Sequence, residues 1–187
     1  MEQTSSKHSL ITTKQLTLIG VMTAVICLLA PFAIPILFSP IPITLATLVL
    51  YITAFVLGPK LGTISCLIYL LLGAVGLPVF SGFSGGFAKI AGPTGGYMLG
   101  YLFLTLTVGF FVEHFSGRPL FYTLGLILGT ALCYLFGTIW LGVQMNLSLM
   151  QALSAGVIPY LPGDIIKIII ACLFGPKLRT AIQRLGN

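Results

Sequence analysis

Residues 159–170 read PYLPGDIIKIII and place Asp164 and Lys167 one helical turn apart in an otherwise apolar run. The chain has three acidic residues in all, the other two being Glu2 and Glu113. At the centre of a membrane-spanning helix, Asp and Lys each cost roughly 2.5–3.5 kcal/mol. The question is which feature of the surrounding sequence makes two charged residues tolerable within an apolar segment.

The composition indicates an integral membrane protein. Of the 187 residues, 57% are hydrophobic and 6% are charged, and the mean hydropathy is +1.10. Soluble domains carry about 25% charged residues, so this composition cannot cover a water-facing surface. The net charge of +6 does not indicate nucleic-acid binding, because the basic residues stand singly at the edges of apolar runs.

Six apolar runs predict an all-α membrane protein with six transmembrane helices in a compact bundle. The runs span residues 16–37, 41–57, 61–77, 94–112, 120–143 and 161–178, and a spanning helix needs roughly 17–25 residues. We expect the first helix to be ended or kinked by Pro31 and Pro35. The predicted organisation is a polar N-terminal tail, residues 1–14, and a single six-helix transmembrane domain, residues 15–187.

The charges of the connections predict the orientation. With six spans both termini lie on one side, and that side collects seven basic residues against one, Lys89, on the other. Because cytoplasmic loops carry the excess of Lys and Arg, both termini should be cytoplasmic. The seven are Lys7, Lys14, Lys60, Arg118, Lys177, Arg179 and Arg184.

Two near-copies, LGPKLG at 57–62 and FGPKLR at 174–179, close apolar runs. Each combines a glycine, a proline that interrupts the hydrogen-bond ladder and a lysine that can reach the headgroups. We expect them to end the second and sixth helices.

The third connection, residues 78–93, reads PVFSGFSGGFAKIAGP and is expected on the external side. A glycine-rich stretch can be a flexible tether. This one also contains Phe80, Phe83 and Phe87, which a tether does not need. Apolar anchors on a hinged backbone are typical of a lid that packs over a site.

The acid and base near residue 164 favour a binding site near the external face. Pairing on a helix surface returns only about 0.2–0.5 kcal/mol, which is much less than the cost of burying both charges. Pro159 and Pro162 should start the helix nearby, which would put Asp164 in a first turn that favours a carboxylate. Ionisable residues at membrane depth usually mark a substrate or ion path. The alternative is a structural ion pair between helices.

Other motifs are weaker. GPTGGYMLGY, residues 92–101, should start the fourth helix and leave the backbone N–H groups of Gly95 and Gly96 available to an anion. The four cysteines lie in apolar runs without a CxxC pair, so neither disulfides nor a metal site is expected. The chain contains no phosphate loop and no nucleophile beside a base, so we expect no enzyme and no cofactor.

Four blocks closely resemble the BioY family, the biotin-binding S components of energy-coupling factor (ECF) transporters. They are PIPITLATL (40–48), YLLLGAVGLPVFSGFSGG (69–86), GPTGGYMLGY (92–101) and PYLPGDIIKI (159–168). The resemblance implies a bundle in a bacterial plasma membrane that captures biotin from outside. It also implies three partners besides the lipid bilayer, namely biotin, a transmembrane coupling subunit and cytoplasmic ATPases.

The resemblance also implies the site residues. Asp164 and Lys167 match the acid and base of the family's pocket motif, and the loop from Phe80 to Gly86 matches its lid. The expected substrate-binding residues are Asp164, Lys167, Tyr97, Gly95, Gly96, Gly85, Gly86, Phe80, Thr44, Tyr160 and Lys89. Gly20 and Ala24 match the small residues that dock on the coupling subunit, and Ala46 stands where the family usually has glutamine.

The sequence leaves three other interpretations open. An S component for thiamine or riboflavin would use the same architecture with other pocket residues. A small-solute transporter or channel working alone would need a polar stripe along several helices, and the apolar runs contain none. A purely structural subunit would bind no small molecule.

Overall fold

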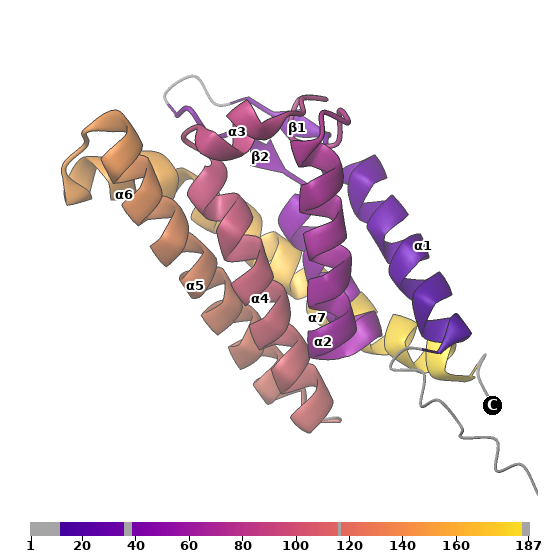
Figure 1. The fold of residues 1–187 in the computed structure, drawn as a ribbon. Helices are drawn as coiled ribbons and strands as arrows, with labels where there is room; N and C mark the ends of the chain where they lie inside the picture. The colour runs from indigo at the N-terminus through magenta and orange to yellow at the C-terminus, as the bar shows by residue number, and fades with distance from the viewer. Residues whose placement is uncertain (1–11, 36–38, 116, 185–187) are drawn as a thin grey trace, which may run out of the picture.

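The computed structural model describes residues 12–35, 39–115 and 117–184 and shows a bundle of long helices (Figure 1). The main helices are α1 (Thr13–Leu29), α2 (Ala46–Ala74), α4 (Gly95–His114), α5 (Pro119–Met145) and α7 (Leu161–Arg184). In the described part of the chain, four helical segments are long and apolar enough to cross a membrane, and α1 is a shorter apolar helix. Most of the predicted polar tail, residues 1–11, lies outside the described residues.

Helix α2 is a hairpin of two arms. Gly58, at φ 74° and ψ −171°, breaks the helical conformation, and Pro59 follows it. A Cβ on Gly62 would lie 3.5 Å from the Ala54 Cα, whereas residues eight positions apart in a straight helix are about 12 Å apart. The chain therefore reverses at LGPKLG, as predicted. Counting both arms with α1, α4, α5 and α7 confirms the predicted six-helix membrane bundle.

The first predicted helix is shorter than expected. Helix α1 ends at Leu29, and an antiparallel ribbon of β1 (Ala33–Ile34) and β2 (Ile43–Thr44) follows. Pro31 and Pro35 lack the N–H groups that a continuing helix needs. The prediction that these prolines end the first helix is therefore confirmed, since α1 ends just before Pro31. The predicted start of the second helix at residue 41 was wrong, and residues 36–37 lie outside the described residues.

The predicted end of the sixth helix at FGPKLR was also wrong. Helix α7 continues through Pro176 to Arg184. Proline removes one backbone hydrogen bond from a helix. The helix tolerates this loss when packing against neighbouring helices holds it in place. Three short helices were not predicted, namely α3 (Phe87–Ala91), α6 (Leu149–Gly156) and the 3₁₀ turn η1 (Ile158–Tyr160).

The two ends of the bundle differ. The β1–β2 ribbon, α3 and α6 gather at one end, whereas α1 begins and α7 ends at the other (Figure 1). Between them lies a core whose fully buried side chains include Tyr51, Phe55, Leu104 and Leu126. Helices α4 and α5 approach closely where Gly96 packs against Trp140, as small residues allow in membrane bundles. The described ends of the chain thus lie at the same end, as an even number of spans requires.

Candidate functional site

Asp164 and Lys167 form an ion pair in the first turns of α7. The Lys167 Nζ lies 2.8 Å from the Asp164 Oδ1, and the two side chains are 12% and 8% exposed. Asp164 lies in the first turn of α7, as predicted from the prolines before it. There the helix dipole favours a carboxylate, which lowers the cost of burying the charge.

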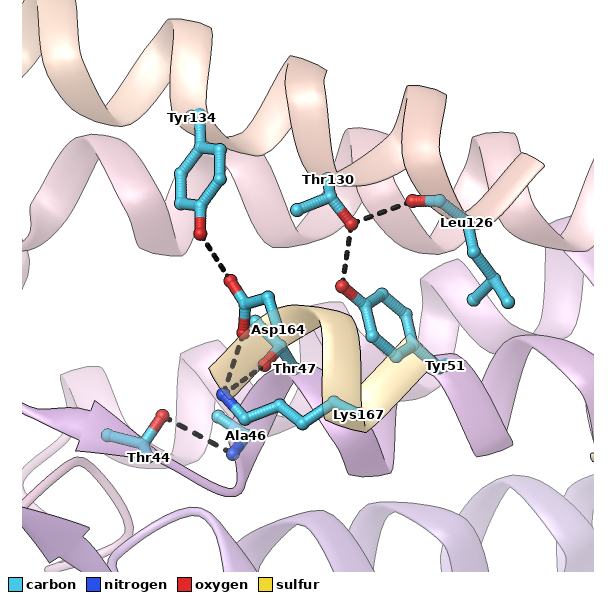
Figure 2. A network of polar contacts seen from close by, with 9 residues as sticks. All are labelled: Thr44, Ala46, Thr47, Tyr51, Leu126, Thr130, Tyr134, Asp164 and Lys167. Atoms are coloured by element: carbon cyan, nitrogen blue, oxygen red, sulfur yellow. Dashed lines mark hydrogen bonds and ion pairs between the residues drawn. The ribbon is translucent and has the colours of Figure 1, made fainter. Parts of the chain in front are cut away.

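Each member of the pair also binds a residue of another helix (Figure 2). The Tyr134 hydroxyl of α5 donates to the Asp164 Oδ2. The Lys167 ammonium donates to the Thr47 Oγ1 of α2 at 3.0 Å. The pair therefore joins three helices at one point. Neither partner was predicted, because each lies far from residue 164 in sequence.

The ion pair lies in the wall of a cavity of about 50 Å³, which we call the charged cavity. Its walls combine charged and hydroxyl groups with apolar surface. The lining residues are Ile41, Pro42, Ile43, Thr44, Thr47, Tyr97, Tyr101, Leu104, Thr130, Cys133, Tyr134, Gly156, Tyr160, Asp164 and Lys167. A few polar groups in an otherwise apolar wall are typical of small-molecule sites.

The segment 39–44 covers one side of this cavity and is fastened to η1 and the end of α6. The Ser39 hydroxyl donates to the Ala155 carbonyl at 2.7 Å and lies 2.6 Å from the Tyr160 hydroxyl. Tyr160 in turn donates to the Ile41 carbonyl. These hydrogen bonds hold Ile41, Pro42, Ile43 and Thr44 against the cavity.

A second cavity of about 30 Å³, the side cavity, adjoins the first. The two share Ile41, Pro42, Thr44, Tyr97 and Tyr101 as walls. The side cavity extends to hydroxyl groups of the glycine-rich loop and of the start of α4, at Ser81 and Thr94. The two cavities therefore lie next to each other, and Asp164 and Lys167 line only the charged cavity.

The structure places five of the predicted site residues together. Asp164, Lys167, Tyr97, Thr44 and Tyr160 all line the charged cavity. The Tyr97 hydroxyl donates to the Gly156 carbonyl at 2.9 Å. This hydrogen bond holds the Tyr97 ring in the wall that the two cavities share.

Gly95 and Gly96 line neither cavity and serve helix packing. A Cβ on Gly95 would come within 1.7 Å of the Ile90 carbonyl oxygen, and one on Gly96 within 2.2 Å of the Trp140 Cβ. The Gly95 N–H also already donates to the Gly92 carbonyl, at 3.0 Å. The structure gives a reason for both glycines without a bound anion.

The remaining loop residues also lie outside the cavity walls. Phe80 is fully buried, with its ring edge-on to Tyr69 at 5.6 Å. Gly85 packs under the Leu77 carbonyl, and the Gly86 N–H donates to the Gly73 carbonyl at 2.7 Å. Lys89 lies in α3 and is half-buried. The loop is folded onto the end of α2, and only Ser81 of it reaches a cavity.

Gly20 and Ala24 lie on an open groove between α1 and the second arm of α2. The groove has a volume of about 550 Å³ and is almost wholly apolar. A Cβ on Gly20 would meet no atom within 4 Å, so the small residue is not needed for packing within the described chain. Ala46 is buried and lines the side cavity.

Several residues that line the charged cavity were not predicted from the sequence. Thr130 and Tyr134 are four positions apart and put two hydroxyl groups on one face of the fifth apolar run, a signal that could have identified them. Tyr101 and Cys133 gave no comparable signal. In residues 12–35, 39–115 and 117–184, no group of three or more His, Cys, Asp and Glu side chains could hold a metal ion.

The fold and the cavity define an all-α integral membrane protein with a charged, partly polar cavity near one end of its helix bundle. The model of the BioY family matches residues 1–184, and the chain belongs to this family.

Relatives and a solved structure agree with this assignment. The biotin transporter BioY of Thermotoga maritima is 34% identical, over 89% of this chain and 96% of the relative. The probable biotin transporter BioY of Pyrococcus horikoshii is 36% identical over the same shares. The crystal structure of an S-component for biotin from an ECF-type ABC transporter superposes with a TM-score of 0.83 at 36% identity, over 89% of this chain and 91% of that chain.

Proposed function

We propose that this chain is the membrane-embedded biotin-binding subunit of an ECF transporter, which captures biotin from outside for uptake. The names of its relatives and of the matching crystal structure support biotin as the ligand. The observation that supports a binding role most strongly is the buried Asp164–Lys167 pair, which faces a cavity rather than a closed core.

The pair has unused hydrogen-bonding capacity. The Asp164 carboxylate has about four acceptor positions and the Lys167 ammonium has three donors. Asp164 accepts from Lys167 and Tyr134, and Lys167 donates to Asp164 and Thr47. At least one donor and more than one acceptor position are therefore left for a ligand in the cavity, and satisfying them offsets part of the burial cost.

Biotin matches this arrangement. Its fused-ring head contains a flat ureido group with two N–H donors and a carbonyl acceptor, and its tail ends in a carboxylate. We assign the ureido N–H side to Asp164 and the carbonyl to Lys167. The tail then runs past Tyr97 and Tyr101 into the side cavity, toward the hydroxyls of Thr94 and Ser81.

Binding requires the walls to move. The two cavities measure about 50 and 30 Å³, whereas sites for drug-sized ligands measure roughly 300–1,000 Å³. The segment 39–44 contains no helix, and hydrogen bonds of Ser39 and Tyr160 fasten it to the end of α6 and to η1. We propose that its release from η1 opens the site.

The partners follow from the same assignment. The groove at Gly20 and Ala24 would receive the transmembrane coupling subunit, and cytoplasmic ATPases would supply the energy. Residues 15–187 would act as one substrate-binding domain with both termini cytoplasmic. The chain itself would have no enzymatic activity and need no cofactor.

Isothermal titration calorimetry of the detergent-purified chain tests this function. We expect biotin to bind with one-to-one stoichiometry, desthiobiotin to bind more weakly because it lacks the thiophane ring, and thiamine to give no signal. A monodisperse, helical preparation that binds thiamine or riboflavin instead of biotin would identify an S component for another vitamin. A preparation that binds none of them would leave the structural ion pair as the explanation of Asp164 and Lys167.

A further inference from the structure

A cavity of about 350 Å³ lies at the end of the bundle opposite the charged cavity, where the arms of α2 meet. It is bounded by the end of the first arm of α2, the start of α5 and the last turns of α7. The residues that line it are Phe55, Gly117, Pro119, Tyr122, Pro176, Arg179, Thr180 and Gln183. None of them contributes to the biotin site proposed above.

Arg179 is held at this cavity by the break in α2. In an unbroken helix the Phe55 carbonyl would accept from the N–H of residue 59, but residue 59 is proline and has none. The Arg179 Nη1 donates to this carbonyl instead, at 3.1 Å. A guanidinium has five N–H donors in a fixed plane, so the anchored group still has donors to offer to a ligand.

The surroundings of Arg179 favour an anion. A neighbouring cavity of about 380 Å³ shares Pro176 and Thr180 with the first and adds Lys177 and Arg184. Three cations of α7 therefore line the two neighbouring spaces. The acidic residues in the described part of the chain are Glu113 and Asp164, and neither lines either cavity. Glu113 lies against Gly58 on the reversal of α2.

Exposed apolar side chains occur on α5 and α7, each next in sequence to a lining residue. Leu120 next to Pro119 is 77% exposed, and Leu178 next to Arg179 is 41% exposed. A ligand with an anionic head and hydrocarbon chains would satisfy both surfaces. Clusters of basic residues at the end of membrane helices bind anionic lipid headgroups in this way.

We propose that Arg179, Gln183 and the neighbouring Lys177 and Arg184 form a binding site for the phosphate group of an anionic lipid. The guanidinium of Arg179 pairs with the phosphate oxygens, and the Gln183 amide donates from the next turn of α7. A lipid there would tie the reversal of α2, the start of α5 and the end of α7 together.

The test measures the binding of a short-chain phosphatidylglycerol to the detergent-purified full chain, with the matching phosphatidylcholine and inorganic phosphate as comparisons. The variants are Arg179→Gln and Gln183→Glu, and the matched control is Arg118→Gln. Arg118 is exposed at the same end, lines neither cavity and stacks on Phe121. Circular dichroism shows whether each variant keeps its helices. Because Gln183 is exposed, its replacement tests the site even if Arg179→Gln fails to fold.

We expect phosphatidylglycerol to bind more tightly than phosphatidylcholine. Each of the two site variants changes the charge of the site by one, which should weaken binding about fivefold or more, and Arg118→Gln should leave binding unchanged. Equal affinity for both lipids would overturn the proposed site, because the headgroup charge would then play no part in binding. An equal loss in the Arg118→Gln control would also overturn it, because it would indicate diffuse surface charge instead of a defined site. Inorganic phosphate that binds as tightly as phosphatidylglycerol would overturn the assignment to a lipid.

Discussion

At the scale of single residues, the charged cavity depends on a carboxylate whose two oxygens have different partners. Lys167 on the same helix binds one oxygen at 2.8 Å, and Tyr134 on α5 binds the other. The first contact is local, and it could be predicted because residues three apart share a helix face. The second joins residues 30 positions apart and depends on how two helices pack, which the local pattern does not contain.

Replacing Lys167 by alanine should abolish most biotin binding, whereas Lys177→Ala should not. Both lysines lie on α7, but only Lys167 lines the charged cavity. Removing one member of a buried, hydrogen-bonded charge pair costs about 2–5 kcal/mol, or ~30-fold and more in Kd. Calorimetric titration of both variants with biotin measures the difference. Similar affinities in the two variants would show that the ammonium group of Lys167 takes no part in binding.

The hydroxyl of Tyr134 should stabilise the fold through the charge of Asp164. Tyr134→Phe removes a hydrogen bond to a carboxylate, so the free energy of unfolding should fall by about 1.5–3 kcal/mol. In an Asp164→Asn background the same change should cost less, because the acceptor is then neutral. A double-mutant cycle in detergent measures this coupling. An equal cost in both backgrounds would argue against a direct interaction of the two side chains.

At the scale of elements, hydropathy predicted the number of helices but not all of their limits. The stretch 30–45 is mostly apolar, with Ser39 and Thr44 as its polar side chains, so hydropathy alone does not separate the end of α1 from the β1–β2 ribbon. Pro31 and Pro35 predicted where the first helix ends. The pairing of Ala33 with Thr44, however, depends on the chain turning back on itself, which no local pattern predicts. Helix α6 had a readable signal, since Ser148 and Gln151 form a capping box at its start.

The identical Gly-Pro-Lys triplets show why local sequence is not sufficient. At Gly58 the backbone takes a positive φ and α2 reverses, whereas Gly175 lies buried within a continuous α7 and packs against the Phe55 ring. The same residues therefore end one helix and continue another. The contacts around them, which come from other helices, decide between the two outcomes.

The contact of α4 with α5 should depend on Gly96 but not on Gly142. A Cβ on Gly96 would lie 2.2 Å from the Trp140 Cβ, whereas one on Gly142 would meet its nearest atom at 3.6 Å. Gly96→Ala should lower the free energy of unfolding by about 1–3 kcal/mol. Gly142→Ala should be neutral or slightly stabilising, because alanine favours the helix by up to ~1 kcal/mol. Thermal unfolding in detergent compares the two, and equal melting temperatures would contradict the close packing at Gly96.

At the scale of the whole molecule, the two ends of the bundle have different chemistry. The ribbon and α3 lie at one end, and α7 finishes at the other (Figure 1). Asp164, in the first turn of α7, lines the charged cavity, whereas Lys177, Arg179 and Arg184 belong to the last turns of α7. The excess of basic residues at the second end predicts that it faces the cytoplasm. A cavity near the opposite end would then open to the outside, as capture of an external nutrient requires.

Cysteine labelling tests this orientation. In a cysteine-free background, a membrane-impermeant maleimide should label a Lys89→Cys variant in intact cells. An Arg184→Cys variant should react only after the membrane is opened. Lys89 lies in α3 and Arg184 ends α7, so the two report on opposite ends of the bundle. The reverse pattern of labelling would invert the proposed topology and turn the biotin site toward the cytoplasm.

The most direct test of the account is a crystal structure of this chain with biotin bound. We expect the ureido group within hydrogen-bond distance of Asp164 and Lys167, in a cavity enlarged from its present volume of about 50 Å³ by displacement of the segment 39–44. Biotin bound elsewhere, with the Asp164–Lys167 pair intact beside an unchanged cavity, would contradict it.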